Sequence, residues 1–286
     1  MTPSRDPETT TLTGAHGLRL VADAWGPPSA PVVLLMHGGG QTRHSWGGTA
    51  EALATLGYRA IAVDARGHGD SDRDPGRRYA APDFAADLAA IAATFDRPPA
   101  VVGASLGGNS ALLAHGDLGA PLGAAVFVDI GPKVELSGVR RIYGFMRARP
   151  DGFASLDEVA DAVAAYQAHR PRPTDTSGLA KNLRRGEDGR WRWHWDPAFL
   201  EVMFQPQPAL PARLEAAARN LSCPVLLVRG KLSYLLSEEN VRDFLALCPH
   251  AEFVDVAGAG HMVAGDVNDR FTAAVAGFLS RRFPSG

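Results

Sequence analysis

The sequence has little cysteine and no excess of charge of either sign. Only two cysteines, Cys223 and Cys248, occur among 286 residues, which excludes a disulfide framework and favours a reducing compartment. The 29 basic and 31 acidic side chains give a formal net charge of -2. Such a balance leaves no basic surface for nucleic acid or for an anionic membrane.

Long hydrophobic runs are also missing. No stretch approaches the ~18 uninterrupted apolar residues of a membrane span, and residues 1–11 are polar and lack the apolar core of a secretory signal. Hydrophobic residues make up 45% and charged residues 21%, a balance that excludes intrinsic disorder. We therefore expect a cytoplasmic globular protein with no membrane contact.

Short apolar runs alternate with helical patterns along most of the chain. The continuously apolar run at 31–36 is typical of a strand covered on both faces, and 18–25 alternates like an edge or antiparallel strand. Further strands are predicted at 59–63, 100–102, 124–128, 225–228 and 252–256, with helices at 49–56, 83–95, 106–115, 237–247 and 266–283. This alternation predicts an α/β fold with a mostly parallel sheet.

The alternation stops at residue 132 and resumes at 223. The intervening stretch is rich in Arg, Pro and Ala and has a helical pattern at 155–169. We predict a core formed by residues 1–132 and 223–286, with residues 133–222 inserted as a helical cap. A long covering of the sheet is the alternative.

A serine motif carries the strongest chemical signal. The segment G-A-S-L-G-G at 103–108 follows the strand at 100–102 and precedes a helical run. A G-x-S-x-G at such a turn holds its serine in a strained conformation and exposes the hydroxyl above the sheet. Ser105 is therefore the candidate nucleophile.

A serine hydroxyl needs a base and an oxyanion site. His261, in G-A-G-H-M after the strand at 252–256, is the candidate base. The H-G-G-G turn at 37–40 follows a buried strand and can supply a backbone N–H, which we place at Gly39. The N–H of Leu106, after the nucleophile, is the expected second donor.

With these motifs, the sequence resembles the α/β-hydrolase superfamily along nearly its whole length. The resemblance rests on H-G-G-G at 37–40, V-D-A-R-G-H-G-D-S at 63–71, the serine motif at 103–107, D-I-G-P at 129–132 and G-H at 260–261. It implies an eight-stranded, mostly parallel sheet flanked by helices, with the cap inserted after the sixth strand. It also implies that residues 66–71 form a structural turn without a catalytic role.

The catalytic acid departs from the family pattern. The family usually carries an aspartate in the loop after the seventh strand, where this sequence has Tyr234. A tyrosine cannot supply the carboxylate that orients the histidine and stabilises its protonated form. Some branches place the acid after the sixth strand, which here is Asp129, and we predict that role for it. Glu238, Glu239 or no acid at all stay open.

Aromatic residues indicate the substrate pocket. Trp46 follows the oxyanion turn, and Trp191 and Trp193 belong to a W-R-W-H-W segment of the cap. We expect these rings and Tyr234 to contact the substrate, although rings that only join cap to core would give the same pattern. His194 and Asp196 lack a third ligand at useful spacing, so no metal site is expected.

The sequence thus favours a cofactor-independent hydrolase that cleaves an ester or lactone of a hydrophobic, aromatic or cyclic small molecule. A homodimer stays open, and no partner other than the substrate is expected. An epoxide hydrolase using Asp129, with Tyr234 and cap tryptophans as donors to the ring oxygen, is the first alternative. A ligand-binding receptor that has lost turnover is the second.

Overall fold

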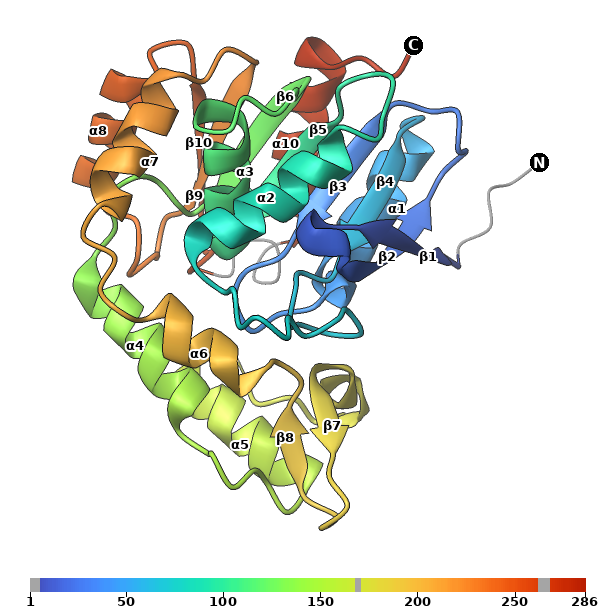
Figure 1. Cartoon of the computed structure of the whole chain (residues 1–286), viewed down its shortest axis with the longest axis vertical. Helices are drawn as coiled ribbons and strands as arrows, with labels where there is room; N and C mark the ends of the chain where they lie inside the picture. The colour runs from blue at the N-terminus through green and yellow to red at the C-terminus, as the bar shows by residue number, and fades with distance from the viewer. Residues whose placement is uncertain (1–5, 168–170, 262–267) are drawn as a thin grey trace.

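The computed structural model describes residues 6–167, 171–261 and 268–286. An eight-stranded sheet has the order β1-β2-β4-β3-β5-β6-β9-β10 (Figure 1). Its strands are β1 (Glu8–Thr13), β2 (Arg19–Trp25), β3 (Val32–Met36), β4 (Arg59–Val63), β5 (Ala100–Ala104), β6 (Ala124–Val128), β9 (Val225–Gly230) and β10 (Glu252–Val256). β2 pairs antiparallel with β1 and with β4, and the other pairs are parallel. The predicted mostly parallel α/β sheet is confirmed.

The first strand was not expected from the sequence. β1 lies at the edge of the sheet and pairs only with β2, so it needs little apolar surface. Its threonine-rich sequence resembles a polar tail, but β-branched threonine suits a half-exposed strand.

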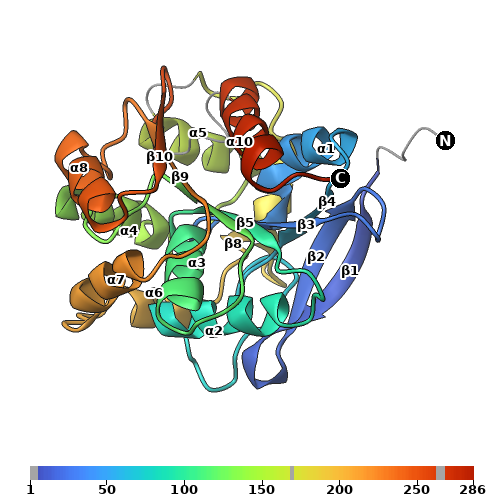
Figure 2. The same ribbon diagram turned by 90° about the horizontal axis from the view of Figure 1, so that it is seen from above.

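Helices cover both faces of the sheet, as Figure 2 shows from above. On one face lie α1 (Gly47–Thr55) and α10 (Asn268–Arg282); on the other lie α2 (Ala81–Ala92), α3 (Leu106–Gly116), α7 (Leu210–Arg219) and α8 (Glu238–Leu247). Strand periodicity explains the two layers: Leu34 and Met36 of β3 pack toward α2 and α3, whereas Val33 and Leu35 pack toward α1 and α10. Residues 266–267 of the last predicted helix lie outside the described residues.

Between β6 and β9 the chain forms a separate layer at the bottom of Figure 1. It contains α4 (Leu136–Arg147), α5 (Leu156–Tyr166), α6 (Pro197–Met203) and the hairpin β7 (Leu183–Arg185) and β8 (Trp191–Trp193). The hairpin was not predicted, because each strand is only three residues long. Short 3₁₀ turns occur at Ala15–Gly17, Arg43–Trp46 and Ser177–Asn182.

Helix α7 joins the core although the sequence places it in the cap. Leu214, Ala217 and Ala218 are buried in the same cluster as the sheet and α3. The boundaries at 132 and 223 stay a prediction, and this packing would move the second one to the start of α7. Within the described ranges, no helix combines the length and apolar character needed to cross a bilayer.

Candidate active site

Ser105 occupies a strained turn between β5 and α3. Its φ of 46° and ψ of -108° lie in a region that side-chain-bearing residues rarely adopt. The turn is possible because glycine flanks the serine: a Cβ on Gly107 would lie 2.3 Å from the backbone oxygen of Met36. Ser105 N–H donates to Val128 O of the neighbouring strand at 3.1 Å, which fixes the turn against the end of β6.

Asp129 follows β6 and reaches His261 of the loop after β10. The Asp129 carboxylate is fully buried and accepts from His261 Nδ1 at 2.7 Å. It also accepts from Ser233 Oγ at 2.5 Å and from Gly230 N–H at 3.2 Å, so three donors stabilise its charged form. With Nδ1 bound to the carboxylate, Nε2 is the histidine nitrogen left for proton transfer.

Strand pairing places Ser105 and Asp129 at the same end of the sheet, the carboxyl end of its parallel strands. Ala104 of β5 pairs with Val128 of β6, so Ser105 and Asp129 are the next residues on two neighbouring parallel strands. No hydrogen bond joins Ser105 Oγ to His261 among the described residues; such bonds often tighten only when substrate binds. The structure therefore brings Ser105, Asp129 and His261 together, and their catalytic roles stay a prediction.

The alternative carboxylates lie elsewhere. Glu238 has 76% of its side chain exposed and lies 3.5 Å from Arg229. Glu239 is exposed at the start of α8. Among the described residues, neither carboxylate contacts His261.

The H-G-G-G turn lies against the serine. A Cβ on Gly38 would be 3.5 Å from Ser105 Cβ, and Gly107 N–H donates to His37 O at 3.2 Å. Gly38 N–H donates to Gln41 Oε1, and Gly40 N–H donates to His68 Nε2. Within the described parts of the chain, the N–H groups of Gly39 and Leu106 have no acceptor. These are the two donors that the sequence predicts for an oxyanion hole, and that function also stays a prediction.

Comparison with known proteins agrees with this arrangement. The model of the alpha/beta hydrolase family matches residues 32–274. The chain belongs to that family.

The relatives of this hydrolase are enzymes named for hydrolysis. It is 30% identical to the esterase Rv0045c of Mycobacterium tuberculosis, over 90% of this chain and 85% of that protein. It is 34% identical to 2-(acetamidomethylene)succinate hydrolase of Mesorhizobium japonicum, over 72% of this chain and 73% of that protein. A crystal structure of E-2-(acetamidomethylene)succinate hydrolase superposes with a TM-score of 0.82 at 25% identity, covering 96% of this chain and 99% of that one. The chain is thus an enzyme, an α/β-fold hydrolase.

Three buried histidines hold the glycine turn of the hydrolase. His37 Nε2 accepts from Ala65 N–H at 3.0 Å, and His68 Nε2 accepts from Gly40 N–H at 3.1 Å. His194, from the cap, accepts from Gly69 N–H at 2.7 Å through Nδ1, and its Nε2 lies 3.3 Å from Gly40 O. The sequence revealed His68 and His194 only as parts of longer motifs, and it gave no sign that their rings meet.

Burial keeps these histidines neutral. It lowers the pKa of His37 despite the nearby Asp64 carboxylate, and it lowers the pKa of His68 further, with help from the two other histidines. For His194, burial and the neighbouring His37 lower the pKa to about 3. Neutral rings are required here, because the nitrogens that accept from Ala65, Gly40 and Gly69 must be unprotonated.

A buried ion pair holds the turn at 66–71, and the absence of a catalytic role for this turn stays a prediction. Arg66 is fully buried and pairs through Nε and one terminal nitrogen with both carboxylate oxygens of Asp87, each at 2.6 Å. This ion pair joins the turn to α2. Among the contacts of the described residues, none joins Arg66 or Asp87 to the candidate catalytic groups.

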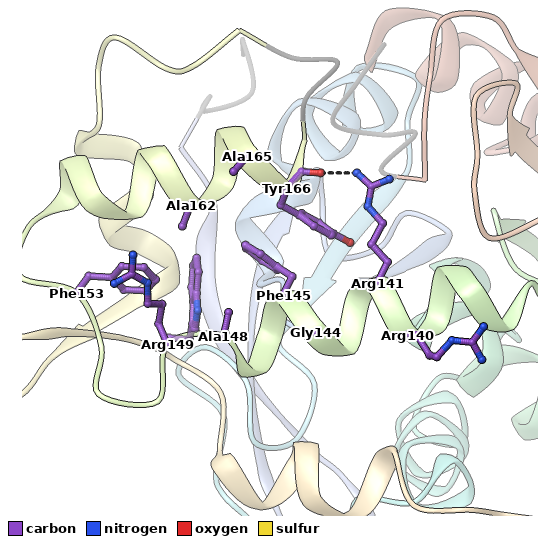
Figure 3. A pocket seen from close by; sticks show the side chains of 11 residues that line it. Arg140, Arg141, Gly144, Phe145, Ala148, Arg149, Phe153, Ala162, Ala165 and Tyr166 are labelled. Carbon is purple, nitrogen blue, oxygen red and sulfur yellow. Dashed lines mark hydrogen bonds between the residues drawn. The ribbon is translucent and has the colours of Figure 1, made fainter.

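The cap carries an open cavity of about 470 Å³ between α4 and α5 (Figure 3). Aromatic side chains form much of its wall: Phe145, Phe153, Tyr166 and Trp193. Tyr166 hydroxyl lies 2.6 Å from Tyr234 hydroxyl, and the Tyr234 ring centroid is 5.8 Å from that of His261. The cavity therefore approaches the candidate active site through this pair of tyrosines.

The structure places two of the four pocket residues expected from the sequence away from this cavity, and the role of all four in substrate binding stays a prediction. Trp46 is 1% exposed and packs against Phe271 of α10 in the core, with ring centroids 6.0 Å apart. Trp191 packs in a small cluster of the cap with Phe153 and Leu183. Neither lines the cavity, whereas Trp193 does and Tyr234 lies between it and His261.

Other aromatic residues lie on or near the cavity wall. Trp195 stacks on Trp193 at 5.1 Å between ring centroids, and a Cβ on Gly40 would lie 3.1 Å from its ring. Trp195 belongs to the W-R-W-H-W segment that the sequence singles out, but β8 ends at Trp193, so strand periodicity does not place its ring. Phe145 and Tyr166, stacked at 4.2 Å, carried no sequence signal.

Among the described residues, no three His, Cys, Asp or Glu side chains gather as a metal site would require. Asp196 accepts from Tyr79 hydroxyl and from Ala198 N–H, and it caps α6. It therefore has a structural use beside His194.

Proposed function

We propose that this hydrolase cleaves a carboxylic ester or lactone through an acyl-enzyme on Ser105. The observation that carries the proposal is the 2.7 Å contact of His261 Nδ1 with the buried carboxylate of Asp129, next to a serine in a strained turn. A carboxylate in that position fixes the histidine tautomer and stabilises the imidazolium that forms during proton transfer.

The reaction would proceed in two steps. His261 Nε2 takes the proton of Ser105 Oγ as the oxygen attacks the substrate carbonyl, and the Gly39 and Leu106 N–H groups hold the resulting oxyanion. The protonated histidine then gives its proton to the leaving alcohol. Water, activated by the same histidine, releases the acid and restores the serine.

The aromatic cavity supports a hydrophobic, aromatic or cyclic substrate. Its rings offer large apolar faces that stack on planar groups. The similar Mycobacterium tuberculosis protein is named an esterase. A second relative, 28% identical over 87% of this chain, is the 3-hydroxybutyrate-oligomer hydrolase of Cupriavidus necator, a name consistent with ester cleavage.

The epoxide alternative rests on the two tyrosines. Tyr234 lies beside His261 and its hydroxyl meets that of Tyr166, so either hydroxyl could donate to a ring oxygen. Asp129, however, is buried and engaged by three donors, so its oxygens are poorly placed to attack a substrate. The contacts therefore favour Asp129 as the partner of His261 and Ser105 as the nucleophile.

The decisive experiment compares the native enzyme with Ser105→Ala. A fluorophosphonate probe should label the native enzyme and not the variant, and kcat for 4-nitrophenyl butyrate should fall about 10⁴- to 10⁶-fold. The circular dichroism spectrum should be unchanged, because the substitution only shortens a side chain in the turn after β5. Retained ester turnover in the variant would overturn the acyl-enzyme. Epoxide turnover without probe labelling would instead support the alternative, and binding without any turnover would support a receptor.

A further inference from the structure

The cavity between α4 and α5 carries positive charge as well as aromatic rings. Arg140, Arg141 and Arg149 line it together with the aromatic residues, and none of the described residues of its wall is acidic. Arg149 lies over the Phe153 ring, 5.8 Å from its centroid. Within the described chain, no carboxylate pairs with any of these three arginines, whereas Arg172, Arg184 and Arg192 of the cap each have such a partner. An aromatic cavity with unpaired guanidinium groups favours an anionic ligand that also has an apolar part.

Arg141 contacts the two tyrosines that connect the cavity with His261. Its guanidinium lies 4.5 Å from the centroid of the Tyr234 ring and 5.5 Å from that of Tyr166. One terminal nitrogen donates to Tyr166 O at 2.7 Å, which fixes the side chain across the gap between α4 and α5 (Figure 3). The remaining N–H groups have no acceptor among the described residues. A planar guanidinium held in this way presents two parallel donors at little entropic cost.

We propose that this cavity binds a carboxylate carried by the substrate and that Arg141 is the residue that recognises it. The preferred substrates would be esters that bear a free acid a short carbon chain from the scissile bond, such as monoesters of dicarboxylic acids. The proposal rests on the proposed ester hydrolysis and adds the substrate class. The tyrosines beside Arg141 are compatible with an anionic ligand. Burial and the hydrogen bond to Tyr234 raise the pKa of Tyr166, so its hydroxyl adds no negative charge near the guanidinium.

Paired substrates test the proposal through turnover. Mono-4-nitrophenyl glutarate carries the free acid, and 4-nitrophenyl butyrate is its neutral counterpart. Arg141→Gln should lower kcat/KM about 10- to 100-fold for the glutarate ester, since a charge-assisted hydrogen bond is lost, and change the butyrate ester less than twofold. Arg141→Lys should fall between, because it keeps the charge without the planar fork. Equal losses on both esters would overturn the assignment.

Arg147→Gln is the matched control. Arg147 lies on α4 near Arg141, donates to Tyr143 hydroxyl at 3.1 Å and does not line the cavity. Its removal should change kcat/KM for both esters less than twofold. A selective loss on the glutarate ester in this variant would show a general effect of cap charge and overturn the role of Arg141.

A binding measurement separates this proposal from the proposed function. Glutarate should bind Ser105→Ala and quench the fluorescence of Trp193 in the cavity wall, and the neutral glutaramide should bind at least tenfold more weakly. Adding Arg141→Gln should remove that difference. Inorganic phosphate that competes as strongly as glutarate would overturn the carboxylate assignment. If neither ester is turned over but glutarate still binds through Arg141, the ester function fails and the anion site stands.

Discussion

Asp129 shows how one carboxylate is prepared to work on a histidine. The backbone at Asp129 has a φ of 52°, in the left-handed region that aspartate tolerates better than most residues. This conformation ends β6 and accompanies a carboxylate that meets Ser233, Gly230 and His261. The loop after β9 therefore contributes donors to the acid, although the family usually places the acid itself there.

We predict that Asp129→Asn lowers kcat for 4-nitrophenyl butyrate by about 10³- to 10⁴-fold with little change in KM. The amide retains the shape but favours the wrong histidine tautomer and cannot stabilise imidazolium. Steady-state kinetics measure both constants. Ser233→Ala, which removes one donor and keeps the carboxylate, should cost tenfold or less. An Asp129→Asn enzyme with near-native kcat would mean that another carboxylate serves His261.

The sequence predicted these residues because their spacing is fixed by short turns. Ser105 and the H-G-G-G turn each directly follow a strand, so a local pattern places them. Trp46 lies only six residues beyond Gly40, yet the side of the chain on which its ring packs depends on α10, more than 200 residues away. Arg141 and Tyr166 come from cap helices whose crossing is set by packing, so no local pattern could pair them.

At the scale of elements, α3 and α7 approach unusually closely. Gly116 ends α3, and a Cβ at that position would lie 2.0 Å from the backbone oxygen of Ala217 in α7. Backbone cannot move aside as a flexible side chain can, so the helices must separate to admit a methyl group. The close contact is part of what attaches α7 to the core.

We predict that Gly116→Ala lowers the free energy of unfolding by about 1–3 kcal/mol, because overpacking forces α7 away from α3. Urea denaturation measures the change. Gly277→Ala in α10 is the control: its nearest neighbour is the Arg281 guanidinium at 3.6 Å, so the gain in helix propensity should raise stability by up to about 1 kcal/mol. If Gly116→Ala were as stable as the native enzyme, α7 would be able to move away from α3 at no measurable cost.

The elements that the sequence missed are those with the weakest need for apolar periodicity. An edge strand such as β1 buries little, and the strands of the cap hairpin are too short to show alternation. The buried central strands were predictable because both of their faces require apolar side chains. The sequence therefore predicts a purely helical cap, whereas part of the cap is the hairpin of β7 and β8.

For the whole molecule, the three neutral histidines make stability depend on pH. An unfolded chain protonates histidine as the pH falls below about 6.5, whereas burial lowers the pKa of His37, His68 and His194 in the folded chain. Between the folded and the unfolded pKa of each histidine, the unfolded state binds more protons than the folded state. The free energy of unfolding therefore falls as the pH falls. For His194 this window extends from about 6.5 down to its folded pKa of about 3.

We predict that His194→Asn makes the fall in stability between pH 6.5 and 4.5 shallower by up to about 1.4 kcal/mol per pH unit. Asparagine keeps an acceptor for Gly69 N–H but does not take up a proton. Urea unfolding at several pH values gives the slope. His16→Asn, at an exposed position with a φ of 60° that asparagine accepts, should leave the slope as it is. An unchanged slope in His194→Asn would refute the assignment.

The hydrogen bonds of His194 also bear on how such an enzyme can be rebuilt. This histidine belongs to the cap, yet it meets Gly69 N–H and Gly40 O in the core, and Trp195 packs over Gly40 beside it. A chimera that exchanged the cap for that of a relative would therefore also exchange the support of the glycine turn. The cap and the glycine turn should therefore be exchanged together. A chimera that exchanges the cap alone must supply a new acceptor for Gly69 N–H if the turn is to keep its conformation.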